Sequence, residues 1–439
     1  MQKDNKFMRI LFCSEFYAPS VGGVQEVMRQ IAERLVKKGH DVTIATSKLD
    51  NRHFKVLNGV NIHEFNVFGN WVSGMSGEVE AYRKFLLTFD YDVLMIKAAQ
   101  QWTFDATWEI IDSIKQPKVF IPCGFSSLYE KKYAKYYEKI PEVLKSFDHL
   151  IFYASKYRDI DFVREKGMSH FTVLSNGASE VEFSVPVDPE FRARQGIPVS
   201  SFVFLTVGSF TGVKGHFELV SAFQQLLIPQ GLHATLILNG NIPSTRKGLI
   251  FTKFCMLLKA HGLKYTIKHL LALPLKKLGI KASRKNPQAV AQIINQHFTD
   301  RRVLVTDLPR TELVQAYMNA NLFVFASNIE YSPLVLFESA AAGTPFLTVD
   351  VGNSLEILDW TGAGFSCESY RDDKNYTRVD ITILAKAMGS LMADKTLILE
   401  KGKIGKERWI QYYTWDIISG HYEAILKLVV AGSAKNNNK

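Results

Sequence analysis

The first fifty residues alternate between apolar runs and one amphipathic stretch. Residues 9–13 and 42–46 are short apolar runs, typical of buried strands. Between them, apolar residues recur at steps of three and four, the spacing of one helix face: Val24, Val27, Met28, Ile31, Ala32, Leu35 and Val36. Gly39 then ends the helical pattern. This strand–helix–strand order predicts a parallel sheet with helices on its faces.

The same alternation restarts near residue 202 and continues along the second half of the chain. It predicts strands and helices at 202–207, 217–223, 234–238, 303–305, 313–318, 322–326, from 333 onward, and 345–349. Two separate series predict two doubly wound α/β domains. The stretch 185–198 carries three prolines and a cluster of charges and is the predicted linker. We therefore expect domains at 1–190 and 199–405, a C-terminal helix at 406–430 and a disordered tail at 431–439.

Positive charge is concentrated in one segment. The net charge is +10, and residues 243–287 hold eleven basic residues and no acidic one. Around residues 263–273 the leucines and lysines separate onto opposite sides of a helical projection. One interpretation is contact with an anionic membrane surface. The other is an insertion whose lysines face water and whose leucines pack on the core. No recognisable nucleic-acid module accompanies the segment, so we expect no nucleic-acid partner.

Cysteine content and hydropathy limit the class of protein. The four cysteines are too few and too scattered for a disulfide framework or a zinc cluster. The apolar stretch near the N-terminus is too short for the core of a signal peptide. No apolar run approaches the roughly 18 residues of a membrane span. These features predict a cytoplasmic protein, with peripheral contact at the inner face of the plasma membrane if residues 243–287 bind lipid.

The most specific passage for chemistry runs from residue 326 to residue 345. An apolar strand ends at Ala326, the following loop carries Glu330, and Glu338 lies a turn and a half into the next helix. At that position Glu338 can accept hydrogen bonds from a ribose. The alternative is a surface acid followed by an acid that favours the helix dipole.

The start of that helix is suited to bind a diphosphate. Ser332 and Pro333 are typical of a helix cap and first helical position. The amides of Leu334 and Val335 then lack partners within the helix, and the positive end of the helix dipole lies beside them. Such an end binds phosphate groups well.

Several further motifs occur in a fixed order along the chain. They are Gly22-Gly23, Ser175-Asn-Gly177, Val207-Gly208 to Lys214-Gly215, Glu330 to Glu338, and Tyr413-Thr-Trp415. In this order the chain resembles the retaining glycosyltransferases of family four (glycosyl transferases group 1). The resemblance covers nearly the whole chain. It implies the GT-B fold, in which two Rossmann-like domains face each other and a C-terminal helix crosses back to the first domain.

The resemblance also implies roles for individual residues. Glu330 is the expected catalytic residue beside the transferred sugar, and Glu338 is expected on the donor's ribose. Lys214, in the loop that begins with Gly208 and Ser209, is expected to neutralise the donor diphosphate without a metal or cofactor. The Gly22-Gly23 loop leaves room for a phosphate or an acceptor. The alternatives are a solvated loop lysine and an ordinary strand–helix turn.

Three positions depart from the family pattern or leave two interpretations open. Ser209 stands where the family usually has an arginine. Cys123 stands at the best match to a histidine near the sugar, and a thiol cannot reproduce the hydrogen bonding of an imidazole. A buried structural cysteine is the other interpretation of Cys123. Glu356 is expected either to contact the donor or to cap a helix.

The activity implied by the resemblance is retaining transfer of a hexosyl group from a UDP- or GDP-sugar. The acceptor would be a glycan or a lipid-linked molecule in the assembly of cell-surface polysaccharide or glycolipid. The competing hypothesis is a non-catalytic partner of a glycan-assembly complex that keeps the fold. Ser209 and Cys123 favour that alternative, whereas Glu330, Glu338 and Lys214 favour an enzyme.

Overall fold

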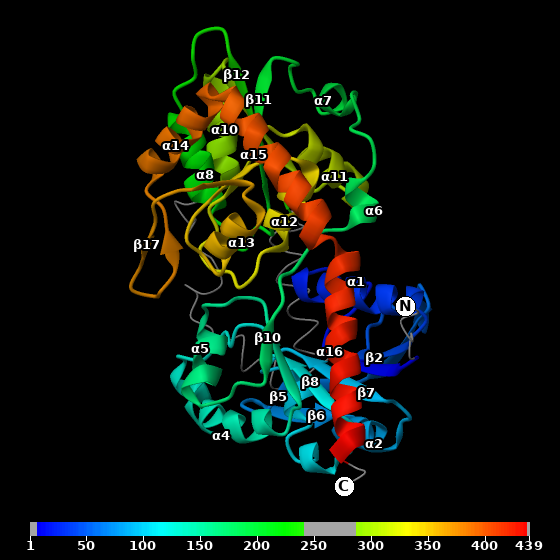
Figure 1. Cartoon of the computed structure of the whole chain (residues 1–439). Coiled ribbons are helices and arrows are strands. Elements are labelled where there is room, and N and C mark those ends of the chain that lie inside the picture. Colours follow the sequence, from blue (N-terminus) through cyan, green and yellow to red (C-terminus); the bar gives the residue numbers. More distant parts are fainter. Residues whose placement is uncertain (1–6, 241–286, 437–439) are drawn as a thin grey trace. The chain divides into compact units, whose positions relative to one another are not determined.

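The computed structural model of the chain describes residues 7–240 and 287–436 (Figure 1). Its contacts divide the chain into two compact units. Unit 1 comprises the described residues within 1–180, 331–337 and 409–439, and unit 2 those within 181–330 and 338–408. The basic segment 243–287 lies outside the described residues except for Pro287.

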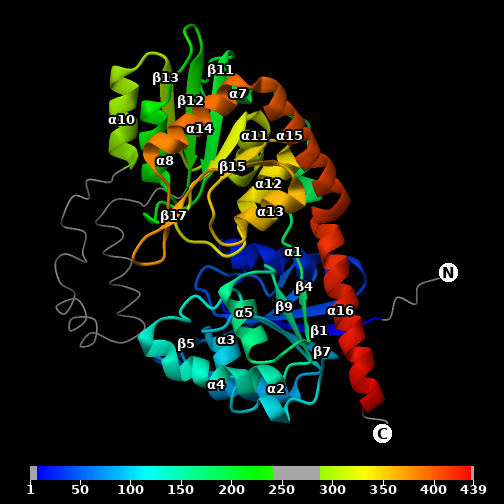
Figure 2. The same cartoon turned by 60° about the vertical axis from the view of Figure 1, so that its left-hand side comes forward.

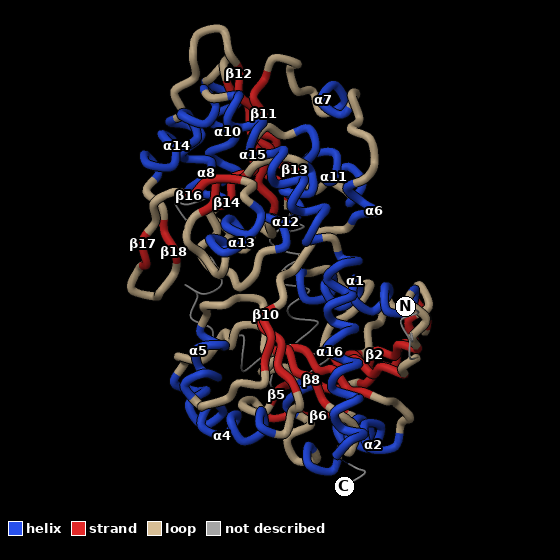
Figure 3. The backbone as a smooth tube through the Cα atoms, in the orientation of Figure 1, coloured by secondary structure: helices blue, strands red, loops and turns tan. Residues whose placement is uncertain are grey.

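Unit 1 is built on an eight-stranded sheet with the order β10-β9-β8-β7-β1-β2-β4-β3. Strands are drawn in red in Figure 3. All neighbours pair in parallel except β3 and β4. The strands are β1 (Arg9–Cys13), β2 (Asp41–Ser47), β3 (Val56–Leu57), β4 (Val60–Phe65), β7 (Val93–Lys97), β8 (Lys118–Ile121), β9 (His149–Phe152) and β10 (Phe171–Val173). A separate antiparallel pair is formed by β5 (Val67–Asn70) and β6 (Gly74–Gly77).

Both faces of this sheet are apolar, because successive side chains of a strand point to opposite sides and those at both sets of positions are apolar. In β1, Ile10 and Phe12 join one core cluster, whereas Leu11 and Cys13 join the other. Helices α1 and α16 lie side by side over the first cluster (Figure 2). The helices of unit 1 are α1 (Gly23–Lys37), α2 (Val79–Thr88), α3 (Trp102–Asp105), α4 (Ala134–Lys145), α5 (Arg158–Glu165) and α16 (Trp415–Asn436), with short 3₁₀ turns η1 (Ile111–Ser113) and η2 (Lys131–Tyr133).

Unit 2 is built on a six-stranded, fully parallel sheet with the order β13-β12-β11-β14-β15-β16. The strands are β11 (Ser201–Val207), β12 (His233–Asn239), β13 (Arg301–Thr306), β14 (Leu322–Phe325), β15 (Phe346–Thr348) and β16 (Gly364–Ser366), and β17 (Tyr370–Arg371) pairs with β18 (Thr377–Arg378). Helices α8, α10 and α14 lie together beside the strands (Figure 2). The helices are α7 (Phe191–Arg194), α8 (His216–Gln225), α10 (Pro287–His297), α11 (Arg310–Asn319), α13 (Ser354–Thr361), α14 (Ile381–Ala393) and α15 (Lys395–Arg408).

Two further helices contain a boundary between the units. The short α6 (Glu180–Phe183) begins with the last residue of the first segment of unit 1, and its other residues belong to unit 2. Helix α12 (Leu334–Ala342) begins in the segment 331–337 of unit 1 and continues in unit 2 from Glu338. The two series of strands and helices confirm the predicted pair of doubly wound α/β domains.

The C-terminal region differs from the single predicted helix at 406–430. Helix α15 ends at Arg408, a π-helical turn spans Trp409–Tyr413, and α16 begins at Trp415. The break occurs because this backbone turns aside to pair with Ala178: the amide of Ala178 donates to the Tyr413 carbonyl (3.0 Å), and the amide of Trp415 donates back to Ala178 (3.2 Å). The indole of Trp409 also donates to Ala178 (3.2 Å). Helix α16 then continues to Asn436, beyond the predicted end at residue 430.

No helix within residues 7–240 and 287–436 combines the length and the apolar character needed to cross a bilayer.

Candidate active site

The carboxyl ends of β11, β12 and β14 form the edge of the unit 2 sheet that carries the predicted donor residues. In parallel α/β sheets this edge is where ligands bind. Gly208 follows β11, and its amide donates to the carbonyl of Asn239 at the end of β12 (3.0 Å). Gly240 lies so close that a Cβ there would be 1.9 Å from the Gly208 carbonyl oxygen. Position 240 therefore has no room for a side chain of its own.

Lys214 and Glu330 come together at this edge from loops more than a hundred residues apart. The Lys214 Nζ lies 2.5 Å from the Glu330 Oε1, and the Ser327 hydroxyl donates to the same oxygen (2.9 Å). The side chains of Lys214 and Glu330 are 28% and 16% exposed. The pair is therefore sheltered but still open to solvent.

The backbone around this pair is held in a conformation that requires glycine. The amide of Asn328 donates to the carbonyl of Val213 (2.9 Å), which ties the two loops together. Gly215 caps α8 with a φ of 70°, in the left-handed region. A Cβ on Gly215 would meet the Ala326 carbonyl oxygen at 1.8 Å, so no larger residue fits without a shift of the backbone.

His216 contributes to the surroundings of Lys214 and was not predicted from the sequence. Its ring lies 4.6 Å from the ring of Phe210, and the side chain is buried. Burial, and then the nearby charge of Lys214, lower the pKa of His216 to about 4. The imidazole is therefore neutral near pH 7 and does not compete with Lys214 for an anion.

Glu338 lies in α12 and is engaged by an arginine that the sequence did not suggest. An Nη2 of Arg310, the first residue of α11, lies 2.7 Å from the Glu338 Oε1. Glu338 as a whole residue is only 8% exposed, so the charge of its carboxylate needs a partner. Helical periodicity predicts the helix α11, but it does not indicate which carboxylate Arg310 contacts.

The other predicted residues of the loop before α12 belong to unit 1. The Nδ2 of buried Asn176 donates to the carbonyl and the hydroxyl of Ser332 (3.2 and 3.1 Å). A Cβ on Gly23, the first residue of α1, would lie 3.9 Å from a methyl group of Leu334. Gly23 and Leu334 thus lie beside each other in unit 1, and Asn176 holds Ser332, two residues before Leu334. Helix α12 begins at Leu334, so Pro333 precedes it and Val335 is its second residue.

Two family profiles together match most of the chain. The profile "Glycosyltransferase Family 4" matches residues 21–177, and "Glycosyl transferases group 1" matches residues 187–385. The chain belongs to glycosyltransferase family 4.

Three known proteins are similar to this family 4 glycosyltransferase. An uncharacterised glycosyltransferase of Methanocaldococcus jannaschii is 22% identical over 372 residues, which are 80% of this chain and 83% of the relative. Sucrose-phosphate synthase of Thermosynechococcus elongatus superposes with a TM-score of 0.68 at 19% identity, covering 97% of this chain and 99% of that one. HepE of Anabaena, solved in complex with UDP, gives a TM-score of 0.63 at 14% identity, covering 96% and 100%. At these identities the structures show the fold, which is GT-B.

The structure also places Ser209 and Cys123, the two predicted departures from the family pattern. Ser209 follows Gly208, and its carbonyl accepts a hydrogen bond from the amide of Thr211 (2.7 Å). Cys123 lies after β8 with a φ of 59°, a conformation that residues other than glycine seldom adopt. Burial raises the pKa of Cys123 to about 11, although the charge of Lys97 opposes this. The sulfur is therefore a neutral thiol near pH 7. The role of Cys123 stays a prediction.

Glu356 lies in the first turn of α13 and is half-buried. An acid there is favoured by the helix dipole. Its role towards a donor stays a prediction.

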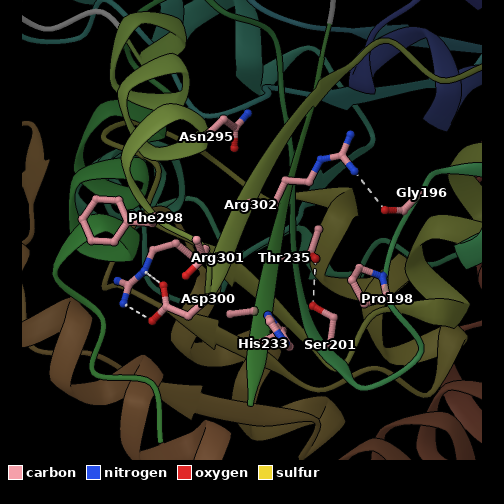
Figure 4. Close-up of a pocket in the computed structure, with 12 residues that line it drawn as sticks. Gly196, Pro198, Ser201, His233, Thr235, Asn295, Phe298, Asp300, Arg301 and Arg302 are labelled. Carbon is pink, nitrogen blue, oxygen red and sulfur yellow. Dashed lines mark hydrogen bonds and ion pairs between the residues drawn. The ribbon is translucent and has the colours of Figure 1, made fainter. Parts of the chain in front are cut away.

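A cavity of about 430 Å³ opens at the opposite edge of the unit 2 sheet (Figure 4). It is lined by residues at the amino ends of β11, β12 and β13, among them Ser201, His233 and Arg302. The hydroxyls of Ser201 and Thr235 are bonded to each other there (2.8 Å). None of the predicted site residues lines this cavity.

Proposed function

We propose that this glycosyltransferase transfers a hexosyl group from a UDP- or GDP-sugar to a glycan or lipid-linked acceptor, with retention of anomeric configuration. The observation that carries the proposal is the Lys214–Glu330 pair, which lies 2.5 Å apart at the carboxyl edge of the unit 2 sheet. A sheltered cation at a sheet edge that carries Gly208 and Gly240 is suited to a diphosphate leaving group. The complex of HepE with UDP supports a nucleotide-containing donor.

In the proposed reaction the bond between the anomeric carbon and the nucleotide diphosphate breaks. A bond from that carbon to the acceptor hydroxyl oxygen forms on the same face of the sugar. The hydroxyl proton passes to the departing phosphate, so no protein nucleophile is needed. Lys214 turns from Glu330 towards the diphosphate and offsets its developing charge.

The two glutamates have separate tasks in this scheme. Glu330 holds Lys214 before the donor binds and then lies beside the transferred sugar. Glu338 accepts hydrogen bonds from the ribose hydroxyls. Ser332, Leu334 and Val335, at the start of α12, are proposed to contribute to diphosphate binding through their backbone amides. No metal is required in this proposal.

Nucleotide release tests the proposal directly. Purified protein is incubated with UDP- and GDP-sugars and with short glycan or lipid-linked acceptors, and the free UDP or GDP is measured. We expect release from one donor class, abolished in Glu330→Gln and strongly reduced in Lys214→Met. NMR of the product then reports its anomeric configuration, and inversion would refute the retaining mechanism.

The second candidate is a non-catalytic partner of a glycan-assembly complex, and the observation that favours it is Ser209 in place of the usual arginine. One cation fewer at the diphosphate weakens stabilisation of the leaving group. If wild-type protein releases no nucleotide from any donor and binds nucleotides no better than Glu338→Ala, the non-catalytic function holds. If the wild-type protein releases UDP or GDP, that result by itself rejects the non-catalytic function.

The acceptor class rests on charge. The basic segment 243–287, with no acidic residue, suits the anionic surface on which a lipid-linked acceptor lies. Cosedimentation with vesicles of anionic and of neutral lipids tests this. Binding that requires anionic lipid and is lost on deletion of 243–287 supports a membrane-bound acceptor, and equal binding by the deleted protein contradicts it.

A further inference from the structure

Glu338 is not an isolated carboxylate. Its Oε1 lies 2.7 Å from an Nη2 of Arg310, and its side chain is 11% exposed. A carboxylate so little exposed is held in one orientation when one of its oxygens is bonded to a guanidinium. The orientation of Glu338 therefore depends on the position of Arg310.

Arg310 is in turn positioned by α6. Its Nε and an Nη2 donate to the two carboxylate oxygens of Glu182 (3.0 and 2.7 Å), a bidentate pair. Its guanidinium also lies over the ring of Phe183, 5.8 Å from the ring centroid. Phe183 meets the ring of buried Tyr317 edge-on at 6.1 Å. One arginine thus links three helices, α6, α11 and α12.

The segment that supplies Glu182 is the one in which the chain passes from unit 1 to unit 2. Glu180, the last residue of the first segment of unit 1, pairs with Arg34 of α1. Glu182, two residues later, pairs with Arg310 within unit 2. Each side of the crossing therefore has its own arginine–glutamate pair.

We propose that Arg310 is a positioning residue for donor binding, which orients Glu338 towards the ribose and is itself oriented by Glu182. The inference rests on the proposed function of Glu338. Arg310 shares one positive charge between two glutamates, so the triad keeps a net negative charge and remains an acceptor for ribose hydroxyls. Without Arg310, Glu338 would be left nearly buried and without this cationic partner, and a second rotamer would compete with the binding one.

Binding of nucleotides with and without ribose hydroxyls separates this role from general stabilisation. Full-length protein is titrated calorimetrically with UDP, GDP and their 2′,3′-dideoxy counterparts. For the nucleotide that wild-type protein binds, we expect the dideoxy form to bind roughly tenfold more weakly, since hydrogen bonds to a carboxylate are lost. Arg310→Gln should weaken the ribonucleotide by about the same factor and leave the dideoxy form unchanged.

A matched control comes from Arg194, the last residue of α7, which is paired with α11. Arg194 pairs with Asp188 (2.6 Å) and with Glu312 of α11 (3.1 Å), and its side chain is 44% exposed against 39% for Arg310. Arg194→Gln removes a comparable shared ion pair away from Glu338 and should bind both nucleotide forms as wild type does. Glu182→Gln keeps the Arg310–Glu338 contact and should show a smaller loss, again for the ribonucleotide alone.

The outcomes are distinct. Equal weakening of ribo- and dideoxynucleotide by Arg310→Gln, or no weakening at all, overturns the positioning role while leaving the proposed function intact. If wild-type protein binds neither UDP nor GDP, the proposed function fails and this inference fails with it. Thermal unfolding without ligand checks folding. If Arg310→Gln is unfolded, Arg310→Lys replaces it, because lysine keeps the charge but cannot form the bidentate hydrogen bonds of a guanidinium. This variant should lose part of the affinity for the ribonucleotide and none of that for the dideoxynucleotide.

Discussion

Removing the Lys214 cation should affect turnover far more than folding. A unit charge about 4 Å from a phosphate oxygen contributes about 4 kcal/mol at an effective dielectric constant near 20. Because the Lys214 side chain is 28% exposed, solvent screens part of this. About 3 kcal/mol should remain, so Lys214→Met should lower kcat roughly 100-fold. The stability cost should be at most about 1 kcal/mol, as for other half-exposed ion pairs.

The control is a pair of nearly identical geometry that lies away from the site. Lys427 Nζ lies 2.5 Å from Glu423 Oε1 in α16, with side chains 31% and 13% exposed. Lys427→Met should therefore change the unfolding temperature about as much as Lys214→Met and leave nucleotide release unchanged. Equal activities of the two variants would refute the assignment of Lys214 to the leaving group.

Two further predictions concern the loop around Lys214. Gly215→Ala should destabilise the protein by about 3 kcal/mol in chemical unfolding, because the new Cβ meets the Ala326 carbonyl. Gly212→Ala, with a φ of 85° but nothing within 4 Å, should cost only about 1 kcal/mol, and equal costs would contradict the clash. His216 has a pKa lowered to about 4, chiefly by burial. Its neutral form stabilises the fold above pH 6.5, and a contribution of about 3 kcal/mol is lost as the pH falls towards 4. In urea unfolding between pH 7 and pH 4, the free energy of unfolding of His216→Phe should therefore depend less on pH than that of the wild type. An unchanged pH dependence would reject this role of His216.

The strands and helices of both units could be predicted because their periodicity is local. The run at 202–207 became β11, and the helical pattern at 217–223 became α8. The C-terminal helix could not be predicted in the same way. Its interruption at Trp409–Tyr413 depends on hydrogen bonds to Ala178, which is distant in sequence and leaves no periodic signal.

The same distinction separates the site residues. Glu330, Glu338 and Lys214 were found because they occur in motifs of recognisable order. Two contacts could not be predicted: that of Lys214 with Glu330 and that of Arg310 with Glu338. Each joins segments that are brought together only by the parallel sheet and its helices. Charge complementarity alone does not select Arg310 from among the many arginines of the chain.

The junction of Ala178 with Tyr413 and Trp415 also has a consequence for the order in which the chain matures during synthesis. One face of the unit 1 sheet is covered by α16, whose buried Trp415, Tyr422 and Leu426 share a cluster with α1. A ribosome makes these residues after every segment of unit 2. The first segment of unit 1 is translated before unit 2, but α16 cannot cover its part of that apolar face until unit 2 has been made. During this interval the nascent chain exposes a surface suited to chaperone binding.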